Sequence, residues 1–180
     1  MESNFVSSDL SSDFYDADKV FDRAVPHEAG HTLMAYKLRM PVRSICIVMG
    51  ESTGSVVTHI EYPRQEEIAT LSEEEVLKCC QVLGAGIAGE RFEKKKIDPL
   101  NLDPSTGDSS ILSSFTDKPL TDFEDPARKV ICANRKRFRE LCSKLRKKYP
   151  AVKEQITKAG TGEFVLLTNE DLDALLANLH

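Results

Sequence analysis

The sequence predicts an α+β fold that is mainly α-helical, with one small β hairpin or sheet. Apolar residues recur at three- and four-residue spacing in several separate stretches of the 180-residue chain, a pattern typical of amphipathic helices. Residues 42–60 instead alternate polar and apolar side chains on either side of a glycine-flanked turn, which predicts a pair of strands. A chain of this length fits one domain, to which we assign residues 17–180.

The first expected helix begins within residues 17–21, or restarts at Pro26, because proline fits the first turn of a helix better than its interior. Pro41 ends it. Residues 42–48 and 55–60 then predict the two strands of the hairpin, with the glycine-flanked turn between them.

A second helix is expected over residues 72–94. Its start is marked by the capping box Ser72-Glu73-Glu74-Glu75, and apolar residues follow at helical spacing. Gly84, Gly86 and Gly89 lie inside this helix and weaken it, so we expect them to allow close packing against a neighbour, namely the first helix.

The second half of the chain predicts further helices, whose bounds are set by prolines, glycines and capping residues. The expected elements are, in order, a long loop over 94–107, a short helix over 108–115, a long helix over 125–149 that Pro150 ends, one or two helical turns over 152–159, a strand or extended link over 164–167, and a last helix from its cap at Thr168 to Leu179.

Composition places the chain among ordinary globular proteins. It is 41% hydrophobic and 29% charged, and its formal net charge of −5 argues against a general binder of polyanions such as nucleic acid. Residues 1–16 are rich in serine and aspartate and predict a disordered acidic tail. Five cysteines without a Cys-x-x-Cys pair, no signal-peptide pattern and no long apolar run favour a cytoplasmic protein with no membrane segment.

One short motif points to chemistry: His27-Glu28-Ala29-Gly30-His31, inside the first expected helix. Histidines four positions apart lie on one helix face and can share a zinc ion. Zinc with three protein ligands keeps a position for water and lowers the pKa of that water to around 7, so that Glu28 can accept its proton. Gly30 costs about 1 kcal/mol relative to alanine, so we expect another backbone or a substrate to approach it closely. The motif predicts hydrolysis of peptide bonds.

A zinc site of this kind needs a third protein ligand from elsewhere in the chain. The residue types that bind zinc through nitrogen or oxygen are histidine, aspartate and glutamate. The candidates are Asp98, Asp103, Asp108, Glu90 and His59.

Several segments resemble the peptidase domain of FtsH-type ATP-dependent zinc proteases. Residues 25–36 are similar to the zinc helix of that family, and the expected strand at 45–47 fits as well. Residues 84–90 resemble its glycine-rich helix, and residues 105–108, Ser-Thr-Gly-Asp, resemble the loop that delivers an aspartate to the metal. Residues 166–172 resemble the closing helix. The segments occur in the family's order and extend over almost the whole expected domain.

The resemblance implies a zincin-like helical domain with the small sheet near the active-site helix. It implies that His27, His31 and Asp108 bind Zn²⁺ and that Glu28 is the general base. The aspartate directly follows the Thr-Gly pair here, whereas family members place it several residues later. Glu90 is the alternative ligand, or a partner that orients a histidine.

The expected function is that of a zinc-dependent metalloendopeptidase that acts on unfolded or extended polypeptides, which pair with an edge strand of residues 42–60. No Gly-x-x-x-x-Gly-Lys-Ser/Thr phosphate loop occurs, so we expect no ATP site and ATP-independent hydrolysis by the isolated chain.

Two alternatives stay open. One is a catalytically inactive peptidase-like domain that serves interaction or regulation. The other is nucleic-acid binding by the basic residues within 128–148, which we instead interpret as a solvated helix face or a contact within a homo-oligomer.

Overall fold

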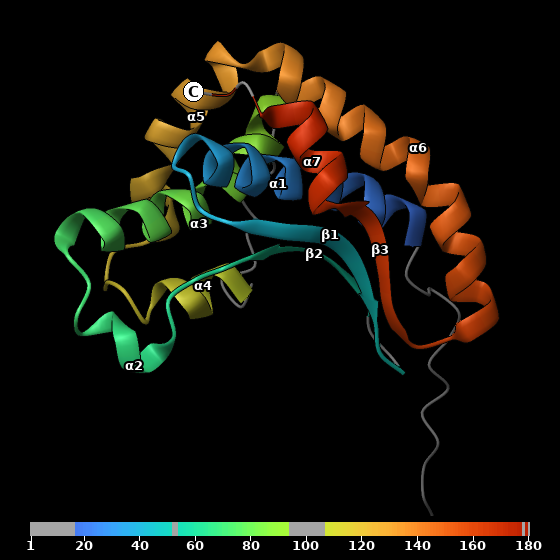
Figure 1. The fold of residues 1–180 in the computed structure, drawn as a ribbon, viewed down its shortest axis with the longest axis horizontal. Coiled ribbons are helices and arrows are strands. Elements are labelled where there is room, and N and C mark those ends of the chain that lie inside the picture. The colour runs from blue at the N-terminus through green and yellow to red at the C-terminus, as the bar shows by residue number, and fades with distance from the viewer. Residues whose placement is uncertain (1–16, 52–53, 94–106, 178, 180) are drawn as a thin grey trace, which may run out of the picture.

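Helices cover one face of a small antiparallel sheet, which confirms the predicted α+β, mainly helical class (Figure 1). The computed structural model describes residues 17–51, 54–93, 107–177 and 179. The expected tail and most of the expected long loop lie outside the described residues. In chain order the described elements are α1 (Ala17–Lys37), β1 (Val42–Met49), β2 (Gly54–Ile60), α2 (Gln65–Ile68), α3 (Glu73–Glu93), α4 (Gly107–Leu112), the 3₁₀ helix η2 (Leu120–Phe123), α5 (Glu124–Ala133), α6 (Arg135–Ala159), β3 (Gly162–Thr168) and α7 (Asn169–Leu176).

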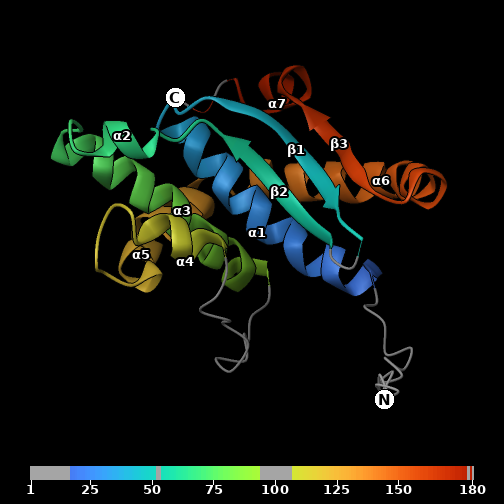
Figure 2. The same ribbon diagram turned by 90° about the horizontal axis from the view of Figure 1, so that it is seen from below.

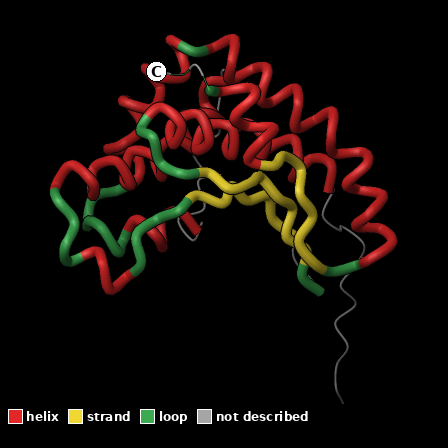
Figure 3. Tube along the Cα trace, in the orientation of Figure 1, coloured by secondary structure: helices red, strands yellow, loops and turns green. Residues whose placement is uncertain are grey.

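The sheet has three strands, because the segment expected as a strand or an extended link becomes β3 and pairs with β1. The three strands are drawn in yellow in Figure 3. β1 lies in the centre, in the order β2-β1-β3, and both pairings are antiparallel (Figure 2). Ile45 and Ile47 of β1 belong to the main core, as expected for residues two positions apart on one face of a strand. β2 and β3 are therefore the two edges of the sheet.

α1 lies behind the sheet and contacts β2 and β1 (Figure 2). Val25, Ala29 and Leu33 recur every four residues along α1 and are fully buried in the main core with the inner face of the sheet and the apolar side of α6. α1 runs through Pro26 without interruption, so it begins at Ala17 and does not restart at the proline. No described helix lies in front of the strands in Figure 2, and we call this open side of the sheet its outer face.

α3 packs against α1 on one side and against η2 and α5 on another. A second apolar cluster joins α3 to α4 and η2 and so fixes α4 beside α3. Neither α2 nor η2 was predicted, because four residues are too few to show a helical period. The buried members of the second cluster are Cys80, Leu83, Ile87, Leu112, Leu120 and Phe123.

The prediction of one helix over residues 125–149 is wrong, because the structure breaks it at Asn134. This residue has φ −112° and ψ 28°, which is not a helical conformation. Its side-chain amide donates to the carbonyl of Val130 over 2.9 Å and satisfies a backbone acceptor in the last turn of α5. Asparagine competes with the helix in this way because its short side chain reaches nearby backbone groups.

The prediction that Pro150 ends a helix is also wrong, since α6 continues to Ala159. Proline inside a helix removes a hydrogen bond and costs about 3 kcal/mol. Packing on both sides offsets this cost: Tyr149 stacks on Phe21 of α1 with ring centroids 3.8 Å apart, and Val152 is buried. The turns expected over residues 152–159 are therefore the end of α6.

The cap of the last helix is confirmed. The hydroxyl of Thr168 accepts from the backbone N–H of Asp171 over 3.2 Å, and α7 follows as far as Leu176. Among the described helices, none combines the length and the apolar character needed to cross a bilayer.

Candidate metal centre

The centre is built on close packing between α1 and α3, which glycines make possible. A carbon added at Gly30 would lie 2.1 Å from the carbonyl oxygen of Ala85, and one added at Gly89 would lie 2.1 Å from that of Pro26. Real side chains do not come this close to a backbone, so both positions require glycine. The expected close approach at Gly30 and at the glycines of α3 is therefore confirmed, except that Gly84 packs on Phe123 of η2.

Three side chains from two elements converge beside this contact. The Nε2 atoms of His27 and His31 lie 2.9 Å and 3.1 Å from the same carboxylate oxygen, Oδ2 of Asp108. The two imidazole rings come from successive turns of α1, and their centroids are 4.6 Å apart. Asp108 belongs to the first turn of α4, which the second apolar cluster holds beside α3. The structure thus brings together all three residues predicted to bind zinc.

Gly86 of α3 leaves the space that the two rings occupy. A carbon added at Gly86 would lie 2.6 Å from Nε2 of His27 and 2.6 Å from Nε2 of His31. Any side chain at this position would displace the rings from the point where they meet Asp108. Gly86, the second of the three glycines expected to allow close packing, is thus required by the site itself.

The other nitrogen of each ring is held by a hydrogen-bond acceptor. Nδ1 of His31 donates to the carbonyl oxygen of Val82 over 2.7 Å, and Nδ1 of His27 donates to Oε1 of Glu90 over 2.8 Å. In a neutral imidazole these bonds place the hydrogen on Nδ1 and leave the Nε2 lone pair free. Both lone pairs then point to the Asp108 oxygen. Glu90 therefore lies on the Nδ1 side of the His27 ring, away from the point where the two Nε2 atoms meet Asp108, and is not placed to act as a ligand there. Its Oε2 atom lies 3.6 Å from Nε of Arg23.

Electrostatics favours positive charge where the three side chains meet. Burial alone would lower the pKa of His27, but its hydrogen bonds to Asp108 and Glu90 outweigh burial and raise the pKa to about 10. The pKa of His31 is also raised, because the charge of Asp108 overcomes the effect of burial. Burial by itself would raise the pKa of Asp108, yet the two histidines hold it far below its usual range. At these separations the two imidazoles and the carboxylate need positive charge between them, which protons on the two Nε2 atoms or a bound cation would supply.

The donor set fits a zinc ion. Two imidazole nitrogens and one carboxylate oxygen form the usual protein part of a zinc site that keeps one position open. Bond lengths of about 2.0–2.1 Å at a tetrahedral angle separate such ligand atoms by about 3.3 Å. The observed distances of 2.9 Å and 3.1 Å require only a small outward movement to reach that value.

Glu28, the predicted base, is buried next to the two histidines and is held by β2. Its Oε2 atom accepts the backbone N–H of Thr58 over 2.8 Å and the Thr58 hydroxyl over 2.7 Å. Thr58 also contacts α1 through Thr32, whose hydroxyl lies 3.4 Å from that of Thr58. The edge strand of the sheet thus positions the Glu28 carboxylate.

The remaining candidates for the third ligand fall elsewhere. Asp98 and Asp103 lie outside the described residues. His59 is on the outer face of the sheet, close to Glu163 of β3. Two partners of the site were not predicted: Val82 acts through its backbone and has no sequence signal, whereas Thr58 lies in the predicted partner strand but could not be oriented from the sequence.

Comparisons of the chain with models of known protein families, with curated proteins and with solved structures found no match. The functional interpretation of this centre therefore depends on its geometry and chemistry.

Proposed function

We propose that the protein is a zinc-dependent metalloendopeptidase that hydrolyses peptide bonds without ATP as an isolated chain. The observation that carries the proposal is the convergence of His27, His31 and Asp108 on one point, at distances of 2.9 Å and 3.1 Å. Zinc bound by these residues would act as a Lewis acid toward the scissile carbonyl and would lower the pKa of water. The kinship with FtsH-type peptidases remains a prediction from the motifs.

Glu28 supplies the proton transfer in this proposal. The carboxylate is the only acidic group within the His27–His31 motif, and it is buried beside the two histidines with Thr58 as its hydrogen-bond partner. It takes a proton from the attacking water and delivers it to the leaving amine. Thr58 keeps the carboxylate in place through two hydrogen bonds, which limits the reorientation that each transfer requires.

The free edge of β2 is the expected place for an extended substrate. β2 pairs with β1 on one side, and on the other side its Thr58 N–H points to Glu28. A polypeptide that adds to this edge as a further strand would therefore pass beside the base. Backbone pairing of this kind selects extended chains and is tolerant of side-chain identity, as expected for action on unfolded polypeptides.

The test is the Glu28→Gln variant of the zinc-loaded chain. Glutamine has nearly the same shape as glutamate but cannot take a proton, so we expect zinc content to stay unchanged and cleavage of unfolded casein to fall by about 10²- to 10⁴-fold. Glu154→Gln is the matched control, because it removes an equal charge from an exposed position of α6. A Glu28→Gln variant that cleaves as fast as the wild type would refute the proposed base.

A second candidate function is that of a catalytically inactive peptidase-like domain for interaction or regulation. The observation that favours it is the double hydrogen bond from Thr58 to Glu28, which occupies both the base and the edge N–H that a substrate would need. Wild-type protein with one equivalent of zinc and no turnover would support this alternative. Wild-type protein that loses all its metal on mild dialysis would exclude the hydrolase.

A further inference from the structure

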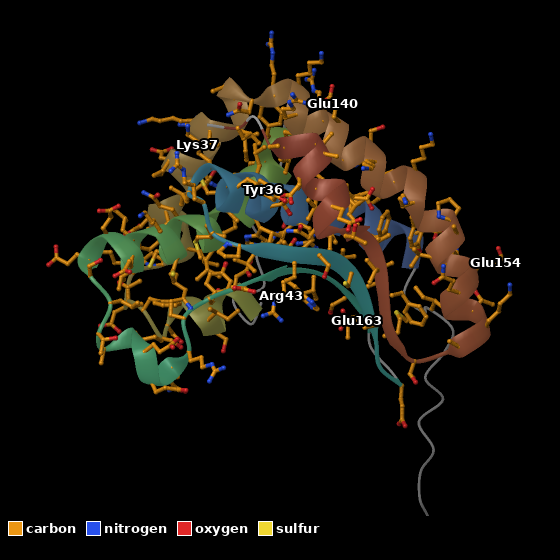
Figure 4. All side chains as sticks on the ribbon, in the orientation of Figure 1. Tyr36, Lys37, Arg43, Glu140, Glu154 and Glu163 are labelled. Carbon is orange, nitrogen blue, oxygen red and sulfur yellow. The ribbon has the colours of Figure 1, made fainter. Side chains whose placement is uncertain are left out.

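We infer that Cys46, His59 and Glu163 form a second zinc site, on the outer face of the sheet. One ligand comes from each strand, and one sulfur, nitrogen or oxygen atom from each lies within 4.8 Å of the other two. This site shares no residue with the candidate metal centre, and the inference does not depend on the proposed function. Glu163 lies near the beginning of β3, an edge strand of the sheet (Figure 4).

The pairing register explains why these side chains meet. His59 of β2 lies opposite Ser44, and Glu163 of β3 lies opposite Val48. Ser44 and Val48 are each two positions from Cys46, in opposite directions along β1. Because side chains alternate between the faces of a strand, all three ligands share one face, with the cysteine between the other two. His59 and Glu163 lean toward Cys46 across the sheet.

The distances match those between ligands of one tetrahedral zinc ion. Sγ of Cys46 lies 3.2 Å from Oε1 of Glu163, and Nδ1 of His59 lies 3.6 Å from the same oxygen. Zinc bonds of about 2.0–2.3 Å at a tetrahedral angle separate sulfur, nitrogen and oxygen ligands by about 3.3–3.6 Å. Two of the three separations therefore already match a shared ion, and the third, between Cys46 and His59, lies within 4.8 Å.

The donor set favours zinc over calcium and magnesium. A thiolate and an imidazole are poor ligands for calcium and magnesium, which prefer oxygen, whereas zinc accepts sulfur, nitrogen and oxygen together. Ser44 adds a fourth polar atom, because its hydroxyl lies 3.2 Å from Sγ of Cys46 and 3.5 Å from Nδ1 of His59. The hydroxyl can hold a water in the fourth position.

A reactive thiol is the competing interpretation of the same cluster. Burial raises the pKa of the Cys46 thiol to about 11, and the hydrogen bond to Glu163 adds to this effect while that to Ser44 opposes it. A thiol of this kind is protonated at neutral pH and is a poor nucleophile in the absence of a metal. The residue itself is fully buried beneath its neighbours.

The role that follows is structural. β3 comes about a hundred residues after β2 in the chain, and a zinc ion on the outer face would join both edge strands to the central strand. Binding to the folded chain alone would stabilise it in proportion to metal concentration.

The experiment is a titration of the metal-free full chain with Co²⁺, which replaces zinc and absorbs light. A thiolate ligand produces a sulfur-to-cobalt charge-transfer band in the near ultraviolet, and the centre of His27, His31 and Asp108 contains no sulfur. We expect this band together with two equivalents of bound cobalt. Cys46→Ser should remove the band and one equivalent, whereas the control Cys132→Ser, at an exposed cysteine of α5, should change neither.

Glu163→Gln provides a second variant in case Cys46→Ser does not fold, because Glu163 is exposed and a change there leaves the core intact. Glu163→Gln should lower the affinity for the cobalt ion that produces the charge-transfer band by at least about 10-fold. Wild-type protein without the band, or a band that survives in Cys46→Ser, would overturn the inference. If the wild type binds one equivalent of cobalt without the charge-transfer band, this site is refuted and the proposed hydrolase is unaffected. If it binds two equivalents with the band but cleaves no peptide, the hydrolase is refuted and this site is unaffected.

Discussion

The substitution Gly86→Ala separates metal binding from folding. The added methyl carbon would lie 2.6 Å from Nε2 of both His27 and His31, whereas ordinary contact begins at 3.4 Å. Each ring must therefore retreat by about 0.8 Å, several times the roughly 0.2 Å tolerance of a metal–ligand bond. The rings cannot retreat freely, because Val82 and Glu90 hold their other nitrogens.

We expect zinc affinity to fall by at least about 100-fold, which is about 2.8 kcal/mol at a factor of ten per 1.4 kcal/mol. Loss of a partner that merely orients a ligand costs about 10- to 100-fold, and this change displaces two ligands at once. The free energy of unfolding of the metal-free protein should change by less than this, because the helix preference of alanine over glycine, about 1 kcal/mol, offsets part of the overpacking cost of about 1–3 kcal/mol.

The assay is competition for zinc with a chromophoric chelator, paired with urea unfolding in the presence of EDTA. Two other glycines serve as controls. Gly107→Ala meets nothing within 4 Å and should change neither quantity, whereas Gly89→Ala meets the Pro26 carbonyl at 2.1 Å and should lower the free energy of unfolding. A Gly86→Ala protein that binds zinc within about threefold of the wild type would refute the placement of the rings.

Further predictions concern the partners of the site and the end of the chain. Glu90→Ala should weaken zinc binding by about 10- to 100-fold in equilibrium dialysis, and unchanged affinity would contradict its role in orienting His27. Thr58→Val removes a hydroxyl donor from Glu28 but keeps the backbone N–H, so kcat should fall by about 10-fold with zinc content unchanged; an effect on KM alone would contradict this. Thr168→Ala should cost about 1 kcal/mol in urea unfolding through loss of the α7 cap, and a change below about 0.3 kcal/mol would show that the cap is not formed. The hydrogen bond from Lys144 lowers the pKa of Asp171 in the folded chain. The ionised carboxylate therefore adds to the free energy of unfolding above about pH 4, and this contribution is lost as the pH falls through the lowered pKa. The free energy of unfolding of Asp171→Asn should therefore fall less than that of the wild type between about pH 6 and about pH 3 in urea unfolding, and an equal fall in both proteins would contradict this.

Local patterns predicted the part of the site that lies on one helix. The spacing of His27 and His31 places both rings on one face of the helix whatever surrounds them. Glycine destabilises a helix interior relative to alanine, so Gly30 indicated a closely packed neighbour. The same reasoning placed the glycines of α3 against α1. These are consequences of helix geometry, so they do not require knowledge of the rest of the chain.

Groups that reach the site through tertiary packing could not be fixed in this way. Asp108 is 77 residues from His31, and its position depends on how the second apolar cluster seats α4 on α3. Val82 contributes a backbone carbonyl, which every residue type has. The wrong helix end at Pro150 has a related cause. Proline disfavours a helix interior, but the stacking of Tyr149 on Phe21 outweighs this local effect.

The way α4 is attached to the fold would determine the order of steps in metal binding and release. His27, His31 and Gly86 belong to two helices whose backbones touch, and this contact holds the two imidazole rings next to each other. Asp108 lies on a six-residue helix whose stronger contacts, among the described elements, are with α3 and η2. Loading would then proceed in a fixed sequence, with the imidazole pair capturing the ion first and the carboxylate closing over it last. Release would follow the reverse order, so the rate of metal exchange would report on the docking of α4 rather than on unfolding of the core.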